Sequence, residues 1–415
     1  MKVKISDIFD FEKGTLQSSK CSVGEYDFIT ASSDWKKHNT YSHECEALII
    51  AVAASGSLGR THYVSGKFIA SDLCFILQPK AKFKEKINLK FYFEYFNFIK
   101  NDLIQKTATG SAKKAINKFN FAKYEINFPN KEYQDRIVQR LYEFKNNFSK
   151  IEENLNYNTE LTTKLRQSIL QDAIQGKLVP QDPTDEPASE LLKRIECCHR
   201  EKPIKCNLNN ELNVIPKGWI YTHLGNVVEN FKYGTSEKSN YNNKGIPVIR
   251  IPNIVNNKIS LKDLKYLETY NVLSNNKVKN GDILIIRSNG SKELVGKTAL
   301  VEDLEQEYAF ASYLIRLRPI MINCEFLIIL LNSYIVKNQF MNLASTTVGI
   351  NNINSEKLSK INIVLPPLKE QERIVKKVKE LMQLCDKLEN ENSNAQKFSS
   401  ELLQSIMQKY FTPEV

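Results

Sequence analysis

The strongest constraint on the fold of this chain is an internal repeat at an offset of 237 residues. Residues 129–138 read PNKEYQDRIV and residues 366–375 read PPLKEQERIV, while residues 165–171 read LRQSILQ and residues 402–408 read LLQSIMQ. The same offset pairs Gly59-Arg60-Thr61 with Gly296-Lys297-Thr298. A repeat of this size indicates a chain built of two related halves with the same succession of elements.

Positive charge is concentrated in one part of each half. Residues 1–130 hold 19 basic and 13 acidic side chains, net +6, and residues 221–370 hold 18 and 13, net +5. Residues 131–220 and 371–415 are each neutral, so the two basic blocks account for the whole formal charge of +11. Basic surfaces attract phosphate through Coulomb forces and counterion release. Two such blocks favour a nucleic-acid binder with two contact regions, although a charge of this size is also common on ordinary soluble proteins.

The neutral segments have the apolar spacing of long helices that pack on a partner helix. Apolar positions follow one another at steps of four and three residues, which is the heptad seam of a coiled coil. The seam runs through Ile137, Leu141, Phe144, Phe148, Ile151 and Leu155 in the first half, and through Ile374, Val378, Leu381, Cys385, Leu388 and Asn392 in the second. We therefore predict long helices over 131–177 and 368–412 that pack against each other, each roughly 65 Å long at ~1.5 Å per residue.

The basic blocks have a different pattern. Short β-branched and aromatic runs, such as residues 46–52, 68–77 and 282–286, alternate with turns rich in Asn, Gly and Ser. This pattern predicts strands, and each block is long enough for one compact domain. The expected fold class is α+β, with domains at 1–130 and 218–367. A proline-containing connector at 178–217 joins the first helix to the second domain.

Composition bounds the class of protein. With 42% hydrophobic and 25% charged residues among 415, the chain has the composition of a globular protein. No apolar run approaches the ~20 residues that span a bilayer, and the opening residues MKVKISD do not resemble a signal peptide. Eight scattered cysteines do not suggest a disulfide scaffold. We expect reduced thiols and a cytoplasmic location.

The most suggestive catalytic pattern is GSKELVGKT at residues 290–298. A phosphate-binding loop has four residues between its two glycines, so that backbone N–H groups surround one phosphate, and here there are five. The other half keeps Gly59-Arg60-Thr61 but changes the residues before it. The pattern favours a turn that positions basic residues. An NTP-hydrolysing enzyme that uses Gly296-Lys297-Thr298 is the alternative.

The residues most similar to a metal site are Cys197, Cys198, His199 and Cys206. Adjacent cysteines at this spacing do not match the usual zinc motifs. The five histidines also lack a paired metal-binding spacing. The sequence therefore predicts neither a metal site nor a catalytic residue.

Several segments resemble one protein family. Residues 165–192, LRQSILQDAIQGKLVPQDPTDEPASELL, strongly resemble the central region of type I restriction-modification specificity subunits. LPPLKEQERIV at 365–375 resembles the family's other shared region, and IPVIRIPNI at 246–254 and GDIL at 281–284 are similar to its target recognition domains. The resemblance covers essentially the whole chain and is weakest over residues 1–130.

The resemblance implies two target recognition domains separated by two long antiparallel coiled-coil helices, with a pseudo-twofold internal repeat. It implies a chain that does no chemistry and reads a bipartite site in double-stranded DNA, one half per domain. Two methyltransferase subunits and the restriction subunits would be its partners. S-adenosylmethionine, ATP and magnesium would be bound by those partners, and this chain would hold no cofactor.

The expected DNA contacts are polar and basic side chains at strand ends and loops, because Arg, Asn, Ser and Thr read base edges and Lys contacts phosphate. In the first domain they are Lys36, Lys37, Ser55, Ser57, Arg60, Thr109, Ser111, Lys113 and Lys114. In the second they are Arg250, Arg287, Ser288, Asn289, Lys292, Lys297, Thr346, Thr347 and Asn351. The remaining alternative is a coiled-coil scaffold without a role on DNA, which a binding isotherm indifferent to salt would favour.

Overall fold

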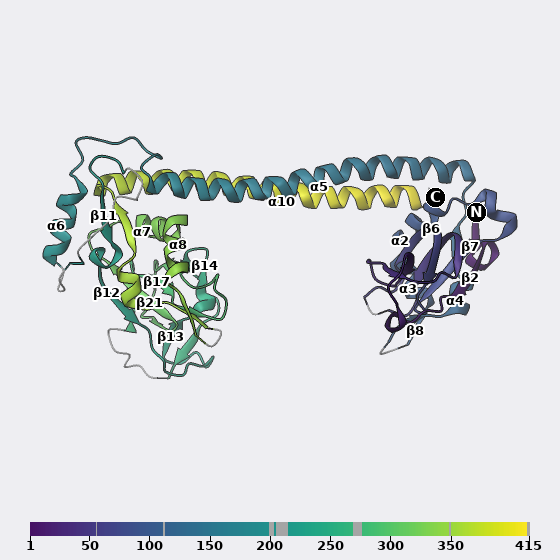
Figure 1. Cartoon of the computed structure of the whole chain (residues 1–415), viewed down its shortest axis with the longest axis horizontal. Helices are drawn as coiled ribbons and strands as arrows, with labels where there is room; N and C mark the ends of the chain where they lie inside the picture. The colour runs from purple at the N-terminus through teal and green to yellow at the C-terminus, as the bar shows by residue number, and fades with distance from the viewer. Residues whose placement is uncertain are drawn as a thin grey trace. The chain divides into compact units, whose positions relative to one another are not determined.

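The chain forms two compact units. The computed structural model describes residues 1–54, 56–110, 113–198, 203–204, 215–268, 276–347 and 350–412, without the side chains of 345–347 and 350. Unit 1 consists of Met1–Asn156 with Ser393–Val415, and unit 2 of Tyr157–Asn392. Two helices of 44 residues each, α5 (Lys131–Ile174) and α10 (Leu368–Phe411), contribute to both units (Figure 1). The fold is thus a mixture of α and β structure with long helices.

Unit 1 is built on a six-stranded sheet. Its elements outside the long helices are β1 (Lys2–Lys4), α1 (Ile5–Ile8), β2 (Phe9–Lys13), η1 (Ser18–Lys20), β3 (Tyr26–Ile29), β4 (Lys36–His38), β5 (His43–Ala51), β6 (Thr61–Ala70), β7 (Cys74–Pro79), η2 (Ala81–Lys86), α2 (Leu89–Phe98), α3 (Lys100–Thr107), β8 (Ala108–Thr109), β9 (Ala115–Ile116), α4 (Lys118–Lys123) and β10 (Glu125–Asn127). The strand order is β2-β7-β5-β6-β3-β4. Along β5, Leu48 and Ile50 join the core that contains α2, while Ala47 and Ile49 join a core on the opposite face. Burial on both faces explains why this strand is a continuous apolar run.

Unit 2 repeats this plan with additional strands. Its elements are α6 (Ala188–Cys198), β11 (Ile220–His223), η3 (Leu224–Val227), β12 (Val228–Tyr233), β13 (Ile246–Ile249), η4 (Ile251–Asn253), β14 (Ile254–Val255), β15 (Lys258–Ile259), β16 (Lys265–Leu267), β17 (Ile283–Ile286), β18 (Ser288–Asn289), β19 (Thr298–Leu300), β20 (Ala309–Phe310), β21 (Leu314–Pro319), α7 (Cys324–Asn332), α8 (Tyr334–Leu343), β22 (Ser345–Thr347), β23 (Ile350–Asn352), α9 (Ser355–Ser359) and β24 (Asn362–Leu365). The main sheet has the order β12-β21-β17-β19-β15-β14. Its central strand β17 also alternates, with Ile283 and Ile285 in one core and Leu284 and Ile286 in another. Each half therefore has a central strand, β5 or β17, that is buried on both faces.

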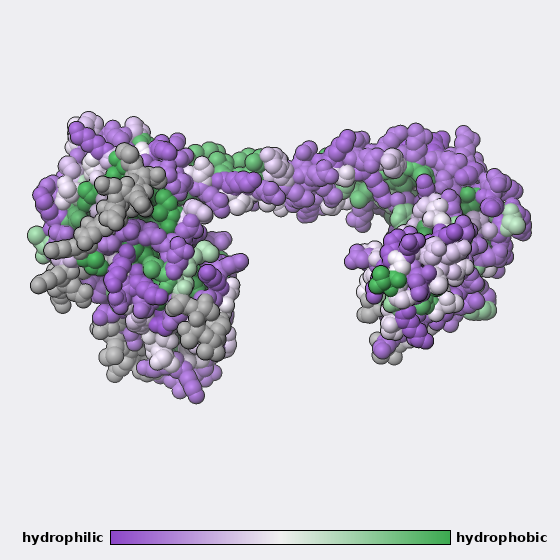
Figure 2. Space-filling model, in the orientation of Figure 1, coloured by the Kyte–Doolittle hydropathy of each residue, from purple (hydrophilic) through white to green (hydrophobic). Residues whose placement is uncertain are grey.

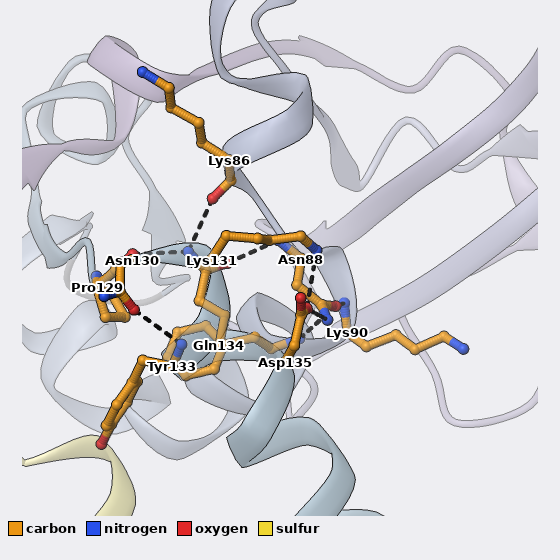
Figure 3. A network of polar contacts seen from close by, with 10 residues as sticks. Lys86, Asn88, Lys90, Pro129, Asn130, Lys131, Tyr133, Gln134 and Asp135 are labelled. Atoms are coloured by element: carbon orange, nitrogen blue, oxygen red, sulfur yellow. Dashed lines mark hydrogen bonds and ion pairs between the residues drawn. The ribbon is translucent and has the colours of Figure 1, made fainter.

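A buried glutamine joins each domain to a long helix. In unit 1, Gln134 of α5 is 0% exposed, and its Oε1 accepts a hydrogen bond from the backbone N of Asn88 at 2.7 Å (Figure 3). Its Nε2 donates to the carbonyl oxygens of Lys86 at 3.0 Å and Pro129 at 2.9 Å. Since Asn88 caps α2, one side chain of α5 fixes the start of a domain helix.

The same arrangement recurs in unit 2, at the repeat offset. Gln371 of α10, also 0% exposed, accepts from the backbone N of Asn323 at 2.9 Å and donates to the carbonyl of Pro366 at 2.9 Å. Asn323 caps α7 as Asn88 caps α2. The glutamine in the repeated sequence is therefore a structural residue in both halves.

Within each unit the two long helices run antiparallel. In unit 1 the start of α5 meets the end of α10, where the Tyr133 hydroxyl donates to the carbonyl of Tyr410 at 3.0 Å. In unit 2, Arg166 of α5 binds Asp386 at 2.5 Å and Glu389 at 2.9 Å on α10. Most of the predicted seam is buried or half-buried, but Ile151 and Leu388 are about half exposed. An α-helix of 3.6 residues per turn drifts relative to a seven-residue repeat, so some positions of a long seam leave the contact face.

The early part of the connector, with Gln181 and Asp185, and Trp219 just after the connector pack on the start of α10. Glu370 is buried and accepts hydrogen bonds from Trp219 Nε1 at 2.9 Å and Gln181 Nε2 at 2.7 Å. Arg373, one turn further, binds the buried Asp185 at 2.6 Å. Burial raises the pKa of the Glu370 carboxyl, and the two hydrogen bonds oppose that rise.

Replacement of Glu370 by glutamine should make unit 2 less sensitive to pH. A carboxyl whose pKa is raised on folding holds its proton more tightly in the folded state, so its contribution to the free energy of unfolding falls as pH rises above the ordinary glutamate pKa. Glutamine does not ionise. The free energy of unfolding of Glu370→Gln minus that of the parent should therefore increase from about pH 4 to pH 7.

Trp219 fluorescence in a Trp35→Phe background measures this, because the chain has two tryptophans and the other lies in unit 1. Glu372→Gln changes an exposed carboxylate two residues away and is the matched control. If the free energies of unfolding of Glu370→Gln and the parent changed with pH in parallel, Glu370 would not be the source of the expected pH dependence.

In the part of the chain that the structure describes, no helix is both long enough and apolar enough to cross a membrane. The described cysteines are all free thiols. Cys197 and Cys198 are exposed, while His199 and Cys206 lie outside the described residues.

Candidate nucleic-acid interface

A small polar sheet follows the central strand of unit 2. The three strands β18, β23 and β22 pair in that order, with Ser288 opposite Asn352 and Asn289 opposite Asn351. The Asn351 amide donates to the carbonyl of Gly290 at 3.2 Å. Three predicted residues, Ser288, Asn289 and Asn351, are thus brought together on one ribbon. Thr346 and Thr347 lie on β22, but their side chains are outside the description.

Arg287 lies between β17 and this ribbon. Its guanidinium carbon is 4.7 Å from the centre of the Tyr233 ring, which is a cation–π distance. The Tyr233 hydroxyl is itself fixed, since it accepts from the backbone N of Ser355 at 3.0 Å and contacts the Ser355 hydroxyl at 3.2 Å. Tyr233 was not predicted from the sequence, because nothing there connects it with Arg287, 54 positions further along the chain.

The other predicted residues of unit 2 have different surroundings. Arg250, after β13, binds the Asp263 carboxylate at 3.1 Å and the Asp263 carbonyl at 3.0 Å, so its charge is already compensated. Lys292 and Lys297 are exposed in the loop between β18 and β19. Lys297 lies near Lys337, where burial and the charge of Lys297 lower the pKa of Lys337. Lys292 therefore lies in the loop that follows β18, and Lys297 lies close to a lysine of α8.

Unit 1 carries a corresponding turn and hairpin. The hairpin of β8 and β9 lies against the end of β5, where Ile116 N donates to Val52 O at 2.8 Å. In unit 2, Ile353 N donates to Arg287 O at 2.9 Å in the same way. The hairpin presents Thr109, Lys113 and Lys114, all exposed, while Ser111 is outside the described residues.

Arg60 closes the turn between β5 and β6. Its Nη1 lies 3.4 Å from the Ser57 hydroxyl and 3.5 Å from the Ala31 carbonyl. Ser55 is outside the described residues. Arg60 and Ser57 therefore meet, as two of the predicted contacts of unit 1.

The lysine pair of unit 1 is on an edge strand. Lys36 and Lys37 are exposed on β4, and Lys37 binds Asp27 at 2.7 Å. The preceding Trp35 is partly exposed, and its Nε1 donates to His62 Nδ1 at 3.3 Å. Burial and the charge of Arg60 lower the pKa of His62, which favours the neutral imidazole. Trp35 was absent from the predicted set, although an exposed aromatic beside two lysines is a typical feature of nucleic-acid surfaces.

In the turn at Gly296-Lys297-Thr298, the groups that a phosphate-binding loop uses, namely backbone N–H groups and the threonine hydroxyl, already form hydrogen bonds inside the domain. The backbone N of Gly296 donates to Ile286 O at 2.9 Å, and that of Lys297 donates to Leu294 O at 3.1 Å. The Thr298 hydroxyl is buried and accepts from the Asn332 amide at 2.8 Å. Amides and a hydroxyl already bonded inside the domain cannot surround a phosphate or bind its metal ion.

Comparisons with known proteins give a consistent result. A family model for the type I restriction modification DNA specificity domain matches residues 1–161 and 216–396. The EcoAI specificity subunit of Escherichia coli is 29% identical over 379 residues, covering 75% of this chain and 62% of the relative. The EcoKI specificity subunit of E. coli strain K12 is 30% identical over 259 residues, covering 62% and 50%. The chain thus spans between half and two thirds of the length of these relatives.

Solved structures share the fold. A chain from a structure on complex assembly and conformational transition of the type I R-M system has a TM-score of 0.63 at 17% identity, covering 100% of this chain and 98% of the other. The HsdS subunit from Thermoanaerobacter tengcongensis has a TM-score of 0.52 at 17% identity, with 100% and 97% covered. The family model matches most of the chain, with one matched segment in each half. The chain therefore belongs to the family of type I restriction-modification DNA specificity domains.

Proposed function

We propose that this chain is the specificity subunit of a type I restriction-modification complex, a non-catalytic subunit that binds DNA and directs its partners to one bipartite site. Each unit would read one half of that site. The observation that carries the proposal is the presence of the family's matched segment in both halves, each with the same hairpin against the end of a central strand. The two basic blocks supply the charge that DNA binding requires.

The long helices are proposed to act as an antiparallel spacer between the two recognition domains, related by a pseudo-twofold axis. The spacing of two half-sites on DNA then follows from the length of the protein between the reading elements. The 237-residue repeat and the matching contacts of Gln134 and Gln371 with the cap of a domain helix support this, because they attach both domains to a long helix in the same way.

Two equivalent apolar patches on the helices suit two copies of one partner. In unit 2 the exposed residues Leu161, Leu165 and Leu388 form the first patch, and Figure 2 shows an apolar area over this part of the helices. In unit 1 the exposed residues Phe398, Leu402 and Ile151 occupy the same three positions at the repeat offset. Every one of the six side chains is at least 42% exposed. Exposed apolar patches mark protein interfaces, and two matching ones fit two methyltransferase subunits.

Chemistry belongs to the partners in this proposal. Methyltransferase subunits would bind S-adenosylmethionine and modify adenine, and restriction subunits would use ATP and magnesium to cut unmodified DNA. This chain would supply only recognition and assembly. Side chains such as those of Arg287 and Asn289 are suited to that role, since guanidinium and amide groups form hydrogen bonds without reacting.

Exchange of residues 1–130 for the matching domain of a relative with another target should change one half-site and leave the other intact. Affinity for DNA should fall steeply with salt and rise when methyltransferase subunits are added, as measured by fluorescence anisotropy. A change in both half-sites would contradict the modular assignment. An isotherm indifferent to salt would instead favour a scaffold without a role on DNA.

A further inference from the structure

The arginines of the two basic blocks differ in what compensates their charge. Arg250 binds Asp263 at 3.1 Å, and Arg318 binds Asp282 at 2.7 Å. Arg316 lies 3.9 Å from the same Asp282. In unit 2, Arg287 is the exception within the described residues, since no carboxylate oxygen lies within 4 Å of it there. Its buried Nε makes no hydrogen bond with a described residue, a feature that it shares with Arg250 and Arg316. A partly buried guanidinium without a carboxylate partner keeps donors available to a ligand.

Tyr233 holds this arginine in a defined orientation. The guanidinium lies over the ring at 4.7 Å, and the ring is anchored through its hydroxyl to Ser355. Stacking on an aromatic face restricts rotation of the side chain but leaves the in-plane N–H donors unused. Arg287 is therefore arranged as a rigid fork of donors.

The fold itself does not require this pair. In unit 2 the strand register places Ile286 opposite Leu314, and in unit 1 it places Ala51 opposite Cys74. The residue after Ile286 is Arg287 and the residue after Ala51 is Val52, so Val52 holds the position of Arg287. Likewise, Tyr233 lies opposite Ile315 in unit 2 and Lys13 lies opposite Phe75 in unit 1, so Lys13 holds the position of Tyr233. Unit 1 forms the same sheet with Val and Lys at these two positions. A residue pair that one domain has and the other lacks, on the same backbone, is what two domains with different targets need.

The neighbours of Arg287 favour a base over a phosphate as its ligand. On the adjoining ribbon, the half-buried Asn289 is of a type that reads base edges, while Ser288 and Asn351 are buried in it. A β-ribbon fits the major groove. Exposed Lys292 and Lys297 on the next loop can contact the DNA backbone. A fixed, planar pair of donors matches the O6 and N7 acceptors of guanine, which is the commonest specific arginine contact in the major groove.

We infer that Arg287, positioned by Tyr233, reads one guanine in the half-site recognised by unit 2. This inference rests on the proposed function and adds to it the base and the residue that selects it. Tyr233 is a positioning residue, because it acts through Arg287.

The test uses the complex of the whole chain with its methyltransferase and the half-site pair that this complex methylates. Each guanine of the duplex is replaced in turn by 7-deazaguanine, which lacks the N7 acceptor but still pairs with cytosine. One substitution should lower kcat/KM for methylation by roughly 5- to 150-fold, the discrimination of a bidentate contact. With Arg287→Ala, normal DNA should be methylated more slowly by a similar factor, and 7-deazaguanine at that position should cause no further loss.

Matched variants separate reading from other roles. Arg287→Lys keeps the positive charge without the paired donors of the guanidinium, and it should lose most of the discrimination between guanine and 7-deazaguanine. Tyr233→Phe keeps the aromatic ring and should retain more of this discrimination than Tyr233→Leu. Lys292→Ala should lower methylation of all sites without changing dependence on any guanine. The inference is overturned if no guanine of the unit 2 half-site is sensitive to replacement by 7-deazaguanine. It is also overturned if Arg287→Ala slows methylation of all sites equally, as loss of a phosphate contact would. Absence of any preferred motif with the parent complex would instead refute the proposed function.

Discussion

Replacement of Asp282 by alanine is expected to lower the free energy of unfolding of unit 2 by about 3–5 kcal/mol. Asp282 is 1% exposed and accepts hydrogen bonds from Arg318 Nε at 2.7 Å, Arg318 Nη2 at 2.8 Å and the backbone N of Lys279 at 2.8 Å. It is also the nearest counter-charge of the buried Arg316. Loss of the carboxylate leaves a buried guanidinium without compensation, which costs far more than loss of an exposed pair.

Urea unfolding followed by Trp219 fluorescence in the Trp35→Phe background gives this free energy for unit 2. Asp263→Ala is the matched control, because it breaks an arginine pair in the same unit whose carboxylate is largely exposed. Asp263→Ala should lower the free energy of unfolding of unit 2 by about 1 kcal/mol or less. Equal effects of the two substitutions would show that the buried cluster around Asp282 is not an organising element of the domain.

Introduction of charge into one helix patch should remove one of two methyltransferase subunits. Leu161→Asp with Leu165→Asp puts two carboxylates into the unit 2 patch, and Phe398→Asp with Leu402→Asp does the same in unit 1. Buried interface anchors contribute about 2–4 kcal/mol each, so affinity at the altered patch should fall roughly 30-fold or more. The assembly should change from two partner subunits per chain to one.

Native mass spectrometry of the co-purified complex measures the stoichiometry. Thr163→Asp places the same charge on an exposed position two residues from both Leu161 and Leu165, about 200° around the helix, and should leave two subunits bound. Retention of both subunits by both double variants would show that the partners bind elsewhere on the chain.

The helical part of the fold could be predicted from the sequence because its signals are local or repeated. Helices predicted over 131–177 and 368–412 are observed as Lys131–Ile174 and Leu368–Phe411. The exposure of Ile151 and Leu388 was not foreseen, since a heptad pattern gives spacing but not the drift of a real helix away from its partner. The roles of Gln134 and Gln371 were likewise hidden, although both lie in the repeat, because their partners are backbone groups of other segments.

The candidate site was predictable in composition but not in detail. Arg, Asn, Ser and Lys after the central strand indicated a polar surface, and Ser288, Asn289 and Asn351 do share a sheet. The sequence could not distinguish Arg250 from Arg287, however, because the difference depends on tertiary neighbours. Asp263 compensates the first, and Tyr233 supports the second. Pairing across the fold decides which charges remain available to a ligand.

The methylation pattern that this chain confers on DNA tests directly whether its two domains read a bipartite site. The chain is co-expressed with the methyltransferase proposed as its partner, and methylated adenines in host DNA are mapped by long-read sequencing. We expect a single split motif with one modified adenine in each half. Methylation without a motif by a stable complex would contradict it, because recognition would then lie outside these two domains.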